Sequence, residues 1–359
     1  MESESIMPAV APAEPLPPQR LRFTGDGGEY FQIWIVNLLL TVLTLGIYSA
    51  WAKVRRLRYF YRNTELAGAR FEYHGDPIAI LKGRMIALGL LLAYQFAPRV
   101  SMRLFALVLL LLAVVMPWLL RQSFRFRMHN SSWRGLRFSF HGSVAEAYTS
   151  FLVLPIFSLI TLYLGAPLMH QRIKQYQHGN ARYGSERFGF HATAGNFYGA
   201  YWIIMLLFLL LIIAGGVVSG MAIAAASAGH GGKPNASAVL GGMLWMFGVI
   251  VAGFLAIGPL WLARIQNLVW NNTTLGAHRF ESKVHAGRLI WITLTNFIGI
   301  VVTLGLFRPW ADVRVARYLL ESVALLPASS LDEFVAGQEQ AMGAVGQEAA
   351  DLFDIDIGL

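Results

Sequence analysis

The sequence has no cysteine and few charged residues. Of its 359 residues, 14% are charged and 56% are hydrophobic, whereas soluble domains have roughly 25% charged residues. The lack of cysteine excludes disulfide bonds, thiol catalysis, cysteine-ligated zinc and iron–sulfur clusters. Charge is missing above all from long apolar runs at 104–120, 198–227 and 238–263. Each run is near or above the ~18–20 residues that cross a hydrocarbon core, so the sequence predicts a multi-pass membrane protein.

Catalytic signatures are also missing. The sequence has no His-Glu-x-x-His, Gly-x-Ser-x-Gly or P-loop motif, and no glycine motif for dinucleotides. The apolar segments hold almost none of the ionisable side chains that a proton- or ion-coupled transporter needs at mid-depth. We therefore expect neither an enzyme nor a coupled transporter, and no cofactor. Residues 1–20 lack a basic and an apolar region, which predicts a disordered tail rather than a cleaved signal peptide.

The basic residues lie directly after the apolar runs. The formal net charge is +9, from 29 Lys and Arg against 20 Asp and Glu. Basic clusters occur at 53–58, 121–127, 172–174 and 314–317. This is the positive-inside pattern of membrane proteins, and it creates a juxtamembrane attraction for anionic lipid. The position of the charge therefore favours membrane lipid over nucleic acid as a partner.

An Arg-Phe pair recurs five times in similar surroundings, which predicts an internal repeat. A polar cluster and a glycine precede the last four copies. Polar residues, a glycine and then alternating aromatic residues are typical of a short β-hairpin with one buried aromatic face. We expect the last four phenylalanines to be equivalent buried anchors. The pairs are Arg22-Phe23, Arg70-Phe71, Arg137-Phe138, Arg187-Phe188 and Arg279-Phe280.

A glycine or proline, often with a tryptophan, precedes each basic segment. Tryptophan beside arginine is typical of an anchor at the membrane edge. Each repeat is therefore predicted to combine a transmembrane or re-entrant helix, a basic interfacial helix and a short β-hairpin. Such repeats predict an α-helical multi-pass membrane domain over residues 21–326. Its apolar segments are 31–52, 78–97, 102–120, 144–169, 198–227, 238–263 and 288–310.

The topology depends on the three short units at 31–52, 144–169 and 288–310. If every apolar segment crosses once, seven spans place equivalent hairpins on opposite faces. If the short units enter and return on one side, nearly all Lys and Arg residues and both termini lie on the cytoplasmic face. The positive-inside rule favours this second arrangement. Re-entrant backbone must be covered by protein, so we expect four full spans to pack around it. The chain would reverse at Gly46, Gly165 and Gly305.

Several stretches match a known family. The sequence reads Phe23-Thr-Gly-Asp-Gly-Gly-Glu-Tyr-Phe, then Leu43-Thr-Leu-Gly-Ile-Tyr-Ser-Ala-Trp-Ala-Lys, then Phe71-Glu-Tyr-His-Gly, with a later echo at Thr303-Leu-Gly-Leu-Phe-Arg-Pro-Trp-Ala-Asp. On these residues the chain resembles the YjgN family of bacterial inner-membrane proteins, from about residue 20 to residue 325. The resemblance implies a bacterial inner-membrane location. It implies no activity, because the family is a domain of unknown function.

Three histidines, His74, His141 and His191, each lie four residues after the arginine of an Arg-Phe pair. Converging hairpins would bring their imidazoles together around a metal such as zinc. We favour a simpler interpretation, in which the repeat needs a polar residue there, as Asp26 and Lys283 indicate in the first and last copies. We therefore expect no metal, and a metal-dependent membrane enzyme remains an alternative.

The candidate binding surface is a basic and aromatic collar on the cytoplasmic side. We expect a non-enzymatic protein that binds anionic lipid or a membrane-protein partner there. The main alternative is a passive channel or an uncoupled, flippase-like transporter with a path between the repeats. The acidic segment 327–359 is either a solvated tail or a segment that orders on a partner. The collar candidates are Lys53, Arg55, Arg56, Arg58, Arg314, Arg317, Trp51, Trp118, Trp261 and Trp310.

Overall fold

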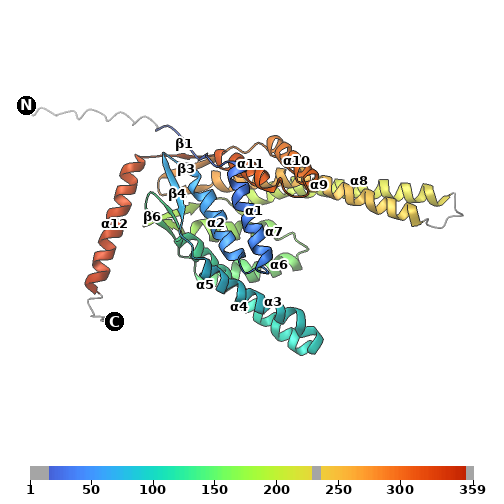
Figure 1. Ribbon diagram of the computed structural model, residues 1–359, viewed down its shortest axis with the longest axis horizontal. Coiled ribbons are helices and arrows are strands. Elements are labelled where there is room, and N and C mark those ends of the chain that lie inside the picture. The colour runs from blue at the N-terminus through green and yellow to red at the C-terminus, as the bar shows by residue number, and fades with distance from the viewer. Residues whose placement is uncertain (1–15, 229–235, 353–359) are drawn as a thin grey trace, which may run out of the picture.

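The computed structural model describes residues 16–228 and 236–352, and most of this part is helical (Figure 1). Most of the predicted N-terminal tail, residues 229–235 and the last seven residues lie outside the described residues. The helices are α1 (Gly27–Leu43), α2 (Ser49–Arg62), α3 (Pro77–Val100), α4 (Met102–His129), α5 (Val144–Tyr148), the π-helical turn η1 (Thr149–Val153), α6 (Leu154–Ile160), α7 (Ala166–Gly179), α8 (Ala194–Ala228), α9 (Ala236–Asn271), α10 (Ala286–Val302), α11 (Arg308–Glu321) and α12 (Leu331–Leu352).

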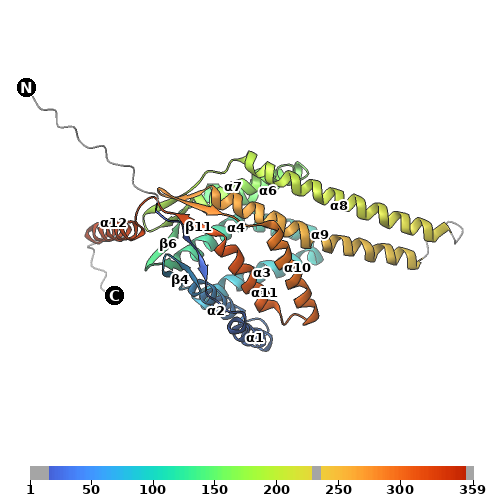
Figure 2. The same cartoon turned by 90° about the horizontal axis from the view of Figure 1, so that it is seen from above.

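Four helices, α3, α4, α8 and α9, are long and apolar enough to cross a membrane. They contain the apolar segments predicted at 78–97, 102–120, 198–227 and 238–263. α3 packs on α4 and α8 on α9, and both pairs extend from the same side of a β-sheet (Figure 2). Few of their side chains are buried within the protein, as expected for helices surrounded by hydrocarbon. The prediction of a mainly helical membrane protein is confirmed.

The three remaining apolar segments each reverse direction in a short turn. α1 leads into α2, α6 into α7 and α10 into α11. In each turn a threonine ends the first helix, and its hydroxyl accepts a hydrogen bond from the backbone amide four residues later, at 2.9–3.0 Å. The next residue is a leucine with φ near +50°, a left-handed conformation that ends helices and redirects the chain. The threonines are Thr44, Thr161 and Thr303, and the leucines are Leu45, Leu162 and Leu304.

Eleven strands form one antiparallel, barrel-like sheet at the base of these helices. Its neighbour order is β1-β11-β10-β9-β8-β7-β6-β5-β4-β3-β2. β1 and β2 belong to one segment joined through Leu21, and they pair with β11 and β3 respectively, which closes the ring. The sequence did not predict this closure. The strands are β1 (Gln19–Arg20), β2 (Arg22–Phe23), β3 (Thr64–Leu66), β4 (Ala69–Tyr73), β5 (Ser131–Trp133), β6 (Leu136–Phe140), β7 (Ala181–Tyr183), β8 (Glu186–Phe190), β9 (Thr273–Leu275), β10 (His278–Ser282) and β11 (Val323–Leu326).

Apolar side chains fill the interior of the barrel. The phenylalanines of β4, β6, β8 and β10 lie next to one another, with ring centroids 6.2–6.5 Å apart. Because successive side chains of a strand point to opposite faces, the arginine before each phenylalanine points outward. The side chains that point inward leave a cavity of about 140 Å³ between them. The interior residues are Leu21, Phe71, Phe138, Phe188 and Phe280, with Leu66, Trp133, Tyr183, Leu275 and Leu325.

Phe23 does not share this interior position. It is 4% exposed, but it packs with Tyr30 of α1 and Tyr59 of α2, and Leu21 takes the interior place. The first Arg-Phe pair is therefore displaced by two residues from the other four, and aligning Arg22-Phe23 with them was wrong. The sequence pattern could not show this, because Arg22-Phe23 has the same two residues as the other four pairs.

A backbone hydrogen bond of the same kind follows each of β2, β4, β6, β8 and β10, and it agrees with this displacement of two residues. The amide of the residue after the strand donates to the carbonyl oxygen of the residue that follows the next helical segment, at 2.8–2.9 Å. Thr24, not Asp26, thus corresponds to the three histidines. The donor and acceptor residues are Thr24 and Asn63, His74 and Asn130, His141 and Asn180, His191 and Asn272, and Lys283 and Ser322.

α12 lies on the side of the sheet opposite the other helices (Figure 1). Its Leu331, Phe334 and Val335 pack against the apolar core of the barrel. Gln338 Oε1 accepts hydrogen bonds from the backbone amides of Ser185 at 2.9 Å and Glu186 at 3.0 Å. A solvated tail is therefore the wrong description of the start of the acidic segment 327–359, because a helix begins there and docks on the barrel.

Candidate functional site

The basic residues predicted on α2 face two different grooves. Lys53 and Arg56 line one groove, and Arg55 and Arg58 line another. Residues three or four apart share a face of a helix, so positions 53 and 56 point to one side and positions 55 and 58 to the other. The predicted collar is therefore divided between two surfaces along α2.

The first of these, which we name the collar groove, has a volume of about 660 Å³. It lies between α2, α10 and α11, and α9 contributes Leu255. Its lining is mostly apolar and includes a small set of charged groups. The lining residues are Leu57, Phe60, Leu255, Phe297, Ile300, Ala311, Val315 and Ala316, with Thr293, Asn296, Lys53, Arg56, Arg308 and Asp312.

The collar groove has an excess of positive charge. Asp312 Oδ1 lies 3.0 Å from Arg308 Nε, and its Oδ2 lies 3.5 Å from an Arg56 nitrogen. Two guanidinium groups therefore share one carboxylate. Lys53 forms no ion pair or hydrogen bond within the described ranges. Burial lowers the pKa of Lys53, and the nearby charges of Arg84 and Arg127 lower it further. An anion would relieve this repulsion.

Two predicted collar residues, Arg314 and Arg317, form internal contacts. Arg314 donates to Asn296 Oδ1 at 2.7 Å and to Thr295 Oγ1 at 3.1 Å, which ties α11 to α10. Arg317 donates to the carbonyl oxygen of Gly25 at 2.7 Å, which ties α11 to the N-terminal segment. Both guanidinium groups thus help to hold the fold together, and this differs from the predicted role in binding lipid.

The four predicted tryptophans also differ in their surroundings. Trp118 of α4 is 46% exposed, as an interfacial anchor would be. Trp51 is half-buried and stacks on Tyr48. Trp310 stacks on Phe31 at 4.9 Å, and Trp261 packs on His170 at 5.8 Å. The last two connect helices to one another, so only part of the predicted aromatic collar is exposed.

The three histidines of the metal alternative do not converge. No group of three or more His, Asp or Glu side chains in the described residues is placed to hold a metal ion. Each imidazole instead contacts a neighbouring hydroxyl: His74 meets Ser132 at 2.8 Å, His141 meets Ser139 at 3.1 Å, and His191 meets Thr274 at 3.2 Å. Equivalent positions around a barrel point outward in different directions, which keeps these side chains apart.

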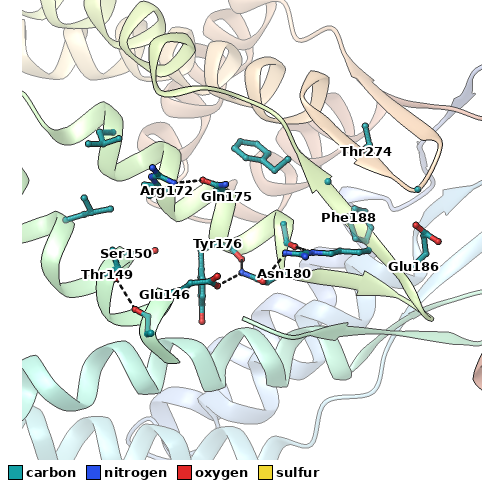
Figure 3. Close-up of a pocket in the computed structure, with 18 residues that line it drawn as sticks. Glu146, Thr149, Ser150, Arg172, Gln175, Tyr176, Asn180, Glu186, Phe188 and Thr274 are labelled. Atoms are coloured by element: carbon teal, nitrogen blue, oxygen red, sulfur yellow. Dashed lines mark hydrogen bonds between the residues drawn. The ribbon is translucent and has the colours of Figure 1, made fainter. Parts of the chain in front are cut away.

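The sequence did not predict a second groove, of about 950 Å³, which lies between α5, η1, α7 and β8 (Figure 3). Its charged groups are those of Glu146, Glu186, Arg172 and Arg187. Asn180 Nδ2 donates to Glu146 Oε2 at 3.0 Å, and Arg172 donates to Gln175 Oε1 at 3.2 Å. We name it the α5–α7 groove. An alignment of residues 26–73 with residues 143–190 would have drawn attention to its polar residues, because five of them are identical in the two segments.

A family model for bacterial proteins of unknown function (DUF898) matches residues 18–352. The chain belongs to this family. Similar proteins include inner membrane protein YjgN of Salmonella typhimurium (strain LT2), 26% identical over 350 residues that cover 84% of this chain and 87% of the relative. Inner membrane protein YjgN of Escherichia coli is 33% identical in strain O157:H7 and 34% in strain K12, over 146 residues, 40% of this chain and 37% of each relative. No solved structure matches.

These findings confirm the resemblance to the YjgN family. The relatives are named inner membrane proteins, which supports a bacterial inner-membrane location for this chain. The four long apolar helices of this DUF898 member are consistent with that location. The family carries no activity to transfer, so function must be argued from the grooves.

Proposed function

We propose that this chain is a non-enzymatic inner-membrane protein that binds anionic lipid in the collar groove. The observation behind the proposal is that Lys53, within the described part of the chain, has no counter-ion in a groove whose other walls are largely apolar. An anionic phospholipid needs cations for its phosphate and apolar surface for its acyl chains. Arg56 and Arg308 would share the phosphate with Lys53. Each basic residue near the surface contributes about 1 kcal/mol, and salt weakens this attraction.

The proposal includes an internal repeat of five units. Five strand-to-helix hydrogen bonds of the same kind support it. So do the two interior residues that each unit supplies to the barrel. Three units hold a short helical hairpin and two hold a long helix pair. On this basis the barrel is the assembled core of the five units.

The three short helical hairpins are inferred to be re-entrant. α1 and α10 each have 17 residues, about 25 Å of helix, which is less than the ~30 Å of a hydrocarbon core. Leu45 and Leu304 at the tips are 95% exposed, and Leu162 is 84% exposed. Backbone amides in these turns are paired within the turn or with the helix before it, as hydrocarbon requires. In this arrangement the barrel and α12 lie on the cytoplasmic side.

Lipid binding in the collar groove can be tested with purified protein in nanodiscs that contain phosphatidylglycerol. We expect the double variant Lys53→Gln, Arg56→Gln to bind this lipid less tightly, and the difference to shrink as salt increases. A matched control removes two outward barrel charges, in Arg22→Gln, Arg137→Gln. If Arg56→Lys alone abolished binding, the bidentate geometry of Arg56, rather than the summed positive charge of the groove, would account for binding.

The alternative of a passive channel finds little support in the barrel. Its interior holds a cavity of about 140 Å³, and aromatic and aliphatic side chains line it. Phe334 of α12 belongs to that lining and covers one end. A path for polar solutes along the barrel axis would require these side chains to move apart. We therefore keep lipid binding as the proposed function.

A further inference from the structure

Two grooves on different parts of the chain contain the same five polar residues. The α1/α2 groove, of about 590 Å³, includes the second basic face of α2. The α5–α7 groove lies in the next short unit (Figure 3). Corresponding residues are 117 positions apart throughout. The first groove has Glu29, Arg55, Tyr59, Asn63 and Arg70, and the second has Glu146, Arg172, Tyr176, Asn180 and Arg187.

This identity is selective, because the two units have otherwise diverged. Residues 26–73 and 143–190 align without a gap, and most aligned residues differ. Of the identical positions, more than half line the grooves, and others belong to the turn or to the barrel interior. The identical pairs are Glu29 and Glu146, Val36 and Val153, Thr44 and Thr161, Leu45 and Leu162, Arg55 and Arg172, Tyr59 and Tyr176, Asn63 and Asn180, Arg70 and Arg187, and Phe71 and Phe188.

The tyrosine and asparagine have structural contacts that position each groove. The Tyr59 hydroxyl donates to the carbonyl oxygen of Asp26 at 2.7 Å, and the Tyr176 hydroxyl donates to that of Ser143 at 3.3 Å. Asn63 and Asn180 each donate to the carbonyl oxygen of the groove tyrosine. Burial, with a contribution from the groove glutamate, raises the pKa of both tyrosines to about 12. Structure alone therefore explains these two residues.

Structural contacts do not fully explain the glutamate and the two arginines. Neither Glu29 nor Glu146 forms an ion pair with an arginine in the described part of the chain. Glu29 Oε2 lies 3.3 Å from the Tyr59 hydroxyl, whose single proton points mainly to the nearer carbonyl oxygen of Asp26, and Glu146 Oε2 accepts from Asn180. Each groove thus holds a corresponding glutamate and two corresponding arginines with no direct ion pair between them. The α1/α2 groove also holds Arg58 and Arg62, and the α5–α7 groove also holds Glu186, so both signs of charge are present in each. Such an arrangement suits a ligand with both signs of charge.

The groove arginines use only part of their hydrogen-bonding capacity within the protein. Arg55 donates through one terminal nitrogen to the Tyr48 hydroxyl at 3.0 Å. Arg187 donates through Nε to the carbonyl oxygen of Gly179 at 2.5 Å. A guanidinium has five N–H donors in a planar fork. These contacts therefore orient the side chains and leave further donors for a ligand.

The third helical hairpin, α10 and α11, lacks the groove glutamate, so it shows the fold without that residue. Arg288 stands where the other units have glutamate, and its guanidinium lies over the Tyr318 ring at 5.4 Å. Arg314, which corresponds to Arg55, turns inward to Asn296. Tyr318 still donates to the carbonyl oxygen of His285 at 3.0 Å, as the other two tyrosines do at their helices. The fold therefore tolerates loss of the glutamate, which indicates that its presence elsewhere serves another purpose.

An exposed apolar stripe leads from each groove toward the tip of its helical hairpin. On α1 it consists of Val36, Leu39 and Leu43, which are 43%, 56% and 76% exposed. The corresponding residues after α5 are Val153, Ile156 and Ile160, at 55%, 50% and 74%. Positions i, i+3 and i+7 share one face of a helix, so each stripe is continuous. A ligand with a charged head and apolar chains would contact both the groove and the stripe.

We propose that each groove binds one zwitterionic phospholipid whose head group carries a primary ammonium. The phosphate lies between Arg55 and Arg70 in one groove, and between Arg172 and Arg187 in the other. The ammonium lies at the groove glutamate, and the acyl chains follow the apolar stripe. Arginine suits phosphate because its planar group donates two parallel hydrogen bonds. This site is separate from the collar groove and does not depend on it.

The test is native mass spectrometry of the full chain in detergent, titrated with lipids that share acyl chains and differ only in head group. We expect two molecules of phosphatidylethanolamine to bind about tenfold more tightly than phosphatidylcholine, since tenfold corresponds to about 1.4 kcal/mol, within the range of a charge-assisted hydrogen bond. A quaternary ammonium cannot donate that bond. We expect Glu29→Gln or Glu146→Gln to leave one selective site, and the double variant to leave none.

The control variant is Arg288→Gln, which changes the corresponding position of the unit without the pattern and should keep both sites. Glu29→Asp, Glu146→Asp should retain part of the selectivity, so a folding defect can be told apart from loss of the carboxylate. Unchanged selectivity in the double Glu→Gln variant would overturn the proposal. So would equal binding of phosphatidylglycerol, which lacks the ammonium, or equally tight binding of water-soluble glycerophosphoethanolamine, which lacks acyl chains. Lys53→Gln, Arg56→Gln should keep this selectivity, which separates the two lipid sites.

Discussion

The barrel and the tips of the helical hairpins use similar apolar residues in opposite ways. In the barrel, Trp133 is 4% exposed and Tyr183 is 1% exposed. At the tips, Leu45 and Leu304 are 95% exposed. Burial within the protein stabilises the barrel, whereas the tips gain the same transfer free energy only if lipid surrounds them. The comparison divides the chain into a part that folds on itself and a part whose stability requires a membrane.

The strongest test of this division is the position of each part relative to the membrane. The chain has no cysteine, so single cysteines can be introduced without a background signal. We expect cysteines at Arg137 and Arg187 to react with an impermeant reagent from the cytoplasmic side only, and a cysteine at Ser101 from the periplasmic side only. A cysteine at Leu304 should react from neither side. Periplasmic labelling near Arg187 but not near Arg137 would replace re-entrant hairpins with seven spans.

A large difference in stability should separate the two parts. Phe138→Ala removes a ring that contacts Phe71, Phe188 and Tyr183 inside the barrel. We expect it to lower the free energy of unfolding by about 3 kcal/mol. Leu304→Ala is the matched change at a tip, and in detergent it should cost about 0.5 kcal/mol or less. Thermal unfolding of both variants measures the difference, and similar losses would mean that the tip packs on protein.

Local sequence patterns predicted the helices and the turns. They did not predict which distant strands pair with one another. Apolar length identified α3, α4, α8 and α9, and Gly46, Gly165 and Gly305 lie in or directly beside the turns where the chain reverses. Closure of the sheet depends on β1 meeting β11, residues about 300 positions apart, which no local pattern encodes. Leu21 was missed as an interior residue because the neighbouring Arg22-Phe23 has the same two residues as the Arg-Phe pairs of β4, β6, β8 and β10.

The candidate site was predicted only in part, for a physical reason. Sequence identifies a basic residue but not the direction of its side chain. Lys53 and Arg56 do line a groove, whereas Arg314 bonds to Asn296 within the fold. The α5–α7 groove was missed because the five polar residues that it shares with the α1/α2 groove come from three different elements, α5, α7 and β8, and from the residue that follows α7, and the packing of these elements brings them together. Residue spacing predicts which residues share one face of a helix. Only the packing of the helices shows which of these faces line a groove.

A smaller loss of stability is expected when the pH is lowered, and it arises at the junction between α7 and the barrel. His178 packs against Phe190 and Trp270, and burial, followed by the charge of Lys174, lowers its pKa to about 4. Below about pH 6.5 the unfolded chain therefore binds a proton that the folded chain does not, so stability falls as pH falls toward 4. Between about pH 7 and pH 5 we expect a loss of about 1–2 kcal/mol from this residue.

The matched variants for this effect are His178→Asn, within the junction, and His129→Asn, at an exposed histidine. Chemical unfolding at about pH 7 and about pH 5 should show a smaller pH dependence for His178→Asn than for wild type, and an unchanged one for His129→Asn. Equal pH dependence in wild type and His178→Asn would mean that the imidazole is solvated. In that case the junction between α7 and the barrel would be looser than the ring contacts indicate.

The smallest expected effect concerns how α12 holds to the barrel. Asp332 of this helix pairs with Arg134 while its side chain remains 84% exposed. Exposed ion pairs contribute about 0.2–1 kcal/mol, so Asp332→Asn should barely change docking of α12. Phe334→Ala should loosen it more, because Phe334 contacts Tyr183 and His278 at the apolar core. Hydrogen exchange in α12 measures both. If Asp332→Asn released the helix and Phe334→Ala did not, charge rather than apolar burial would hold α12 on the barrel.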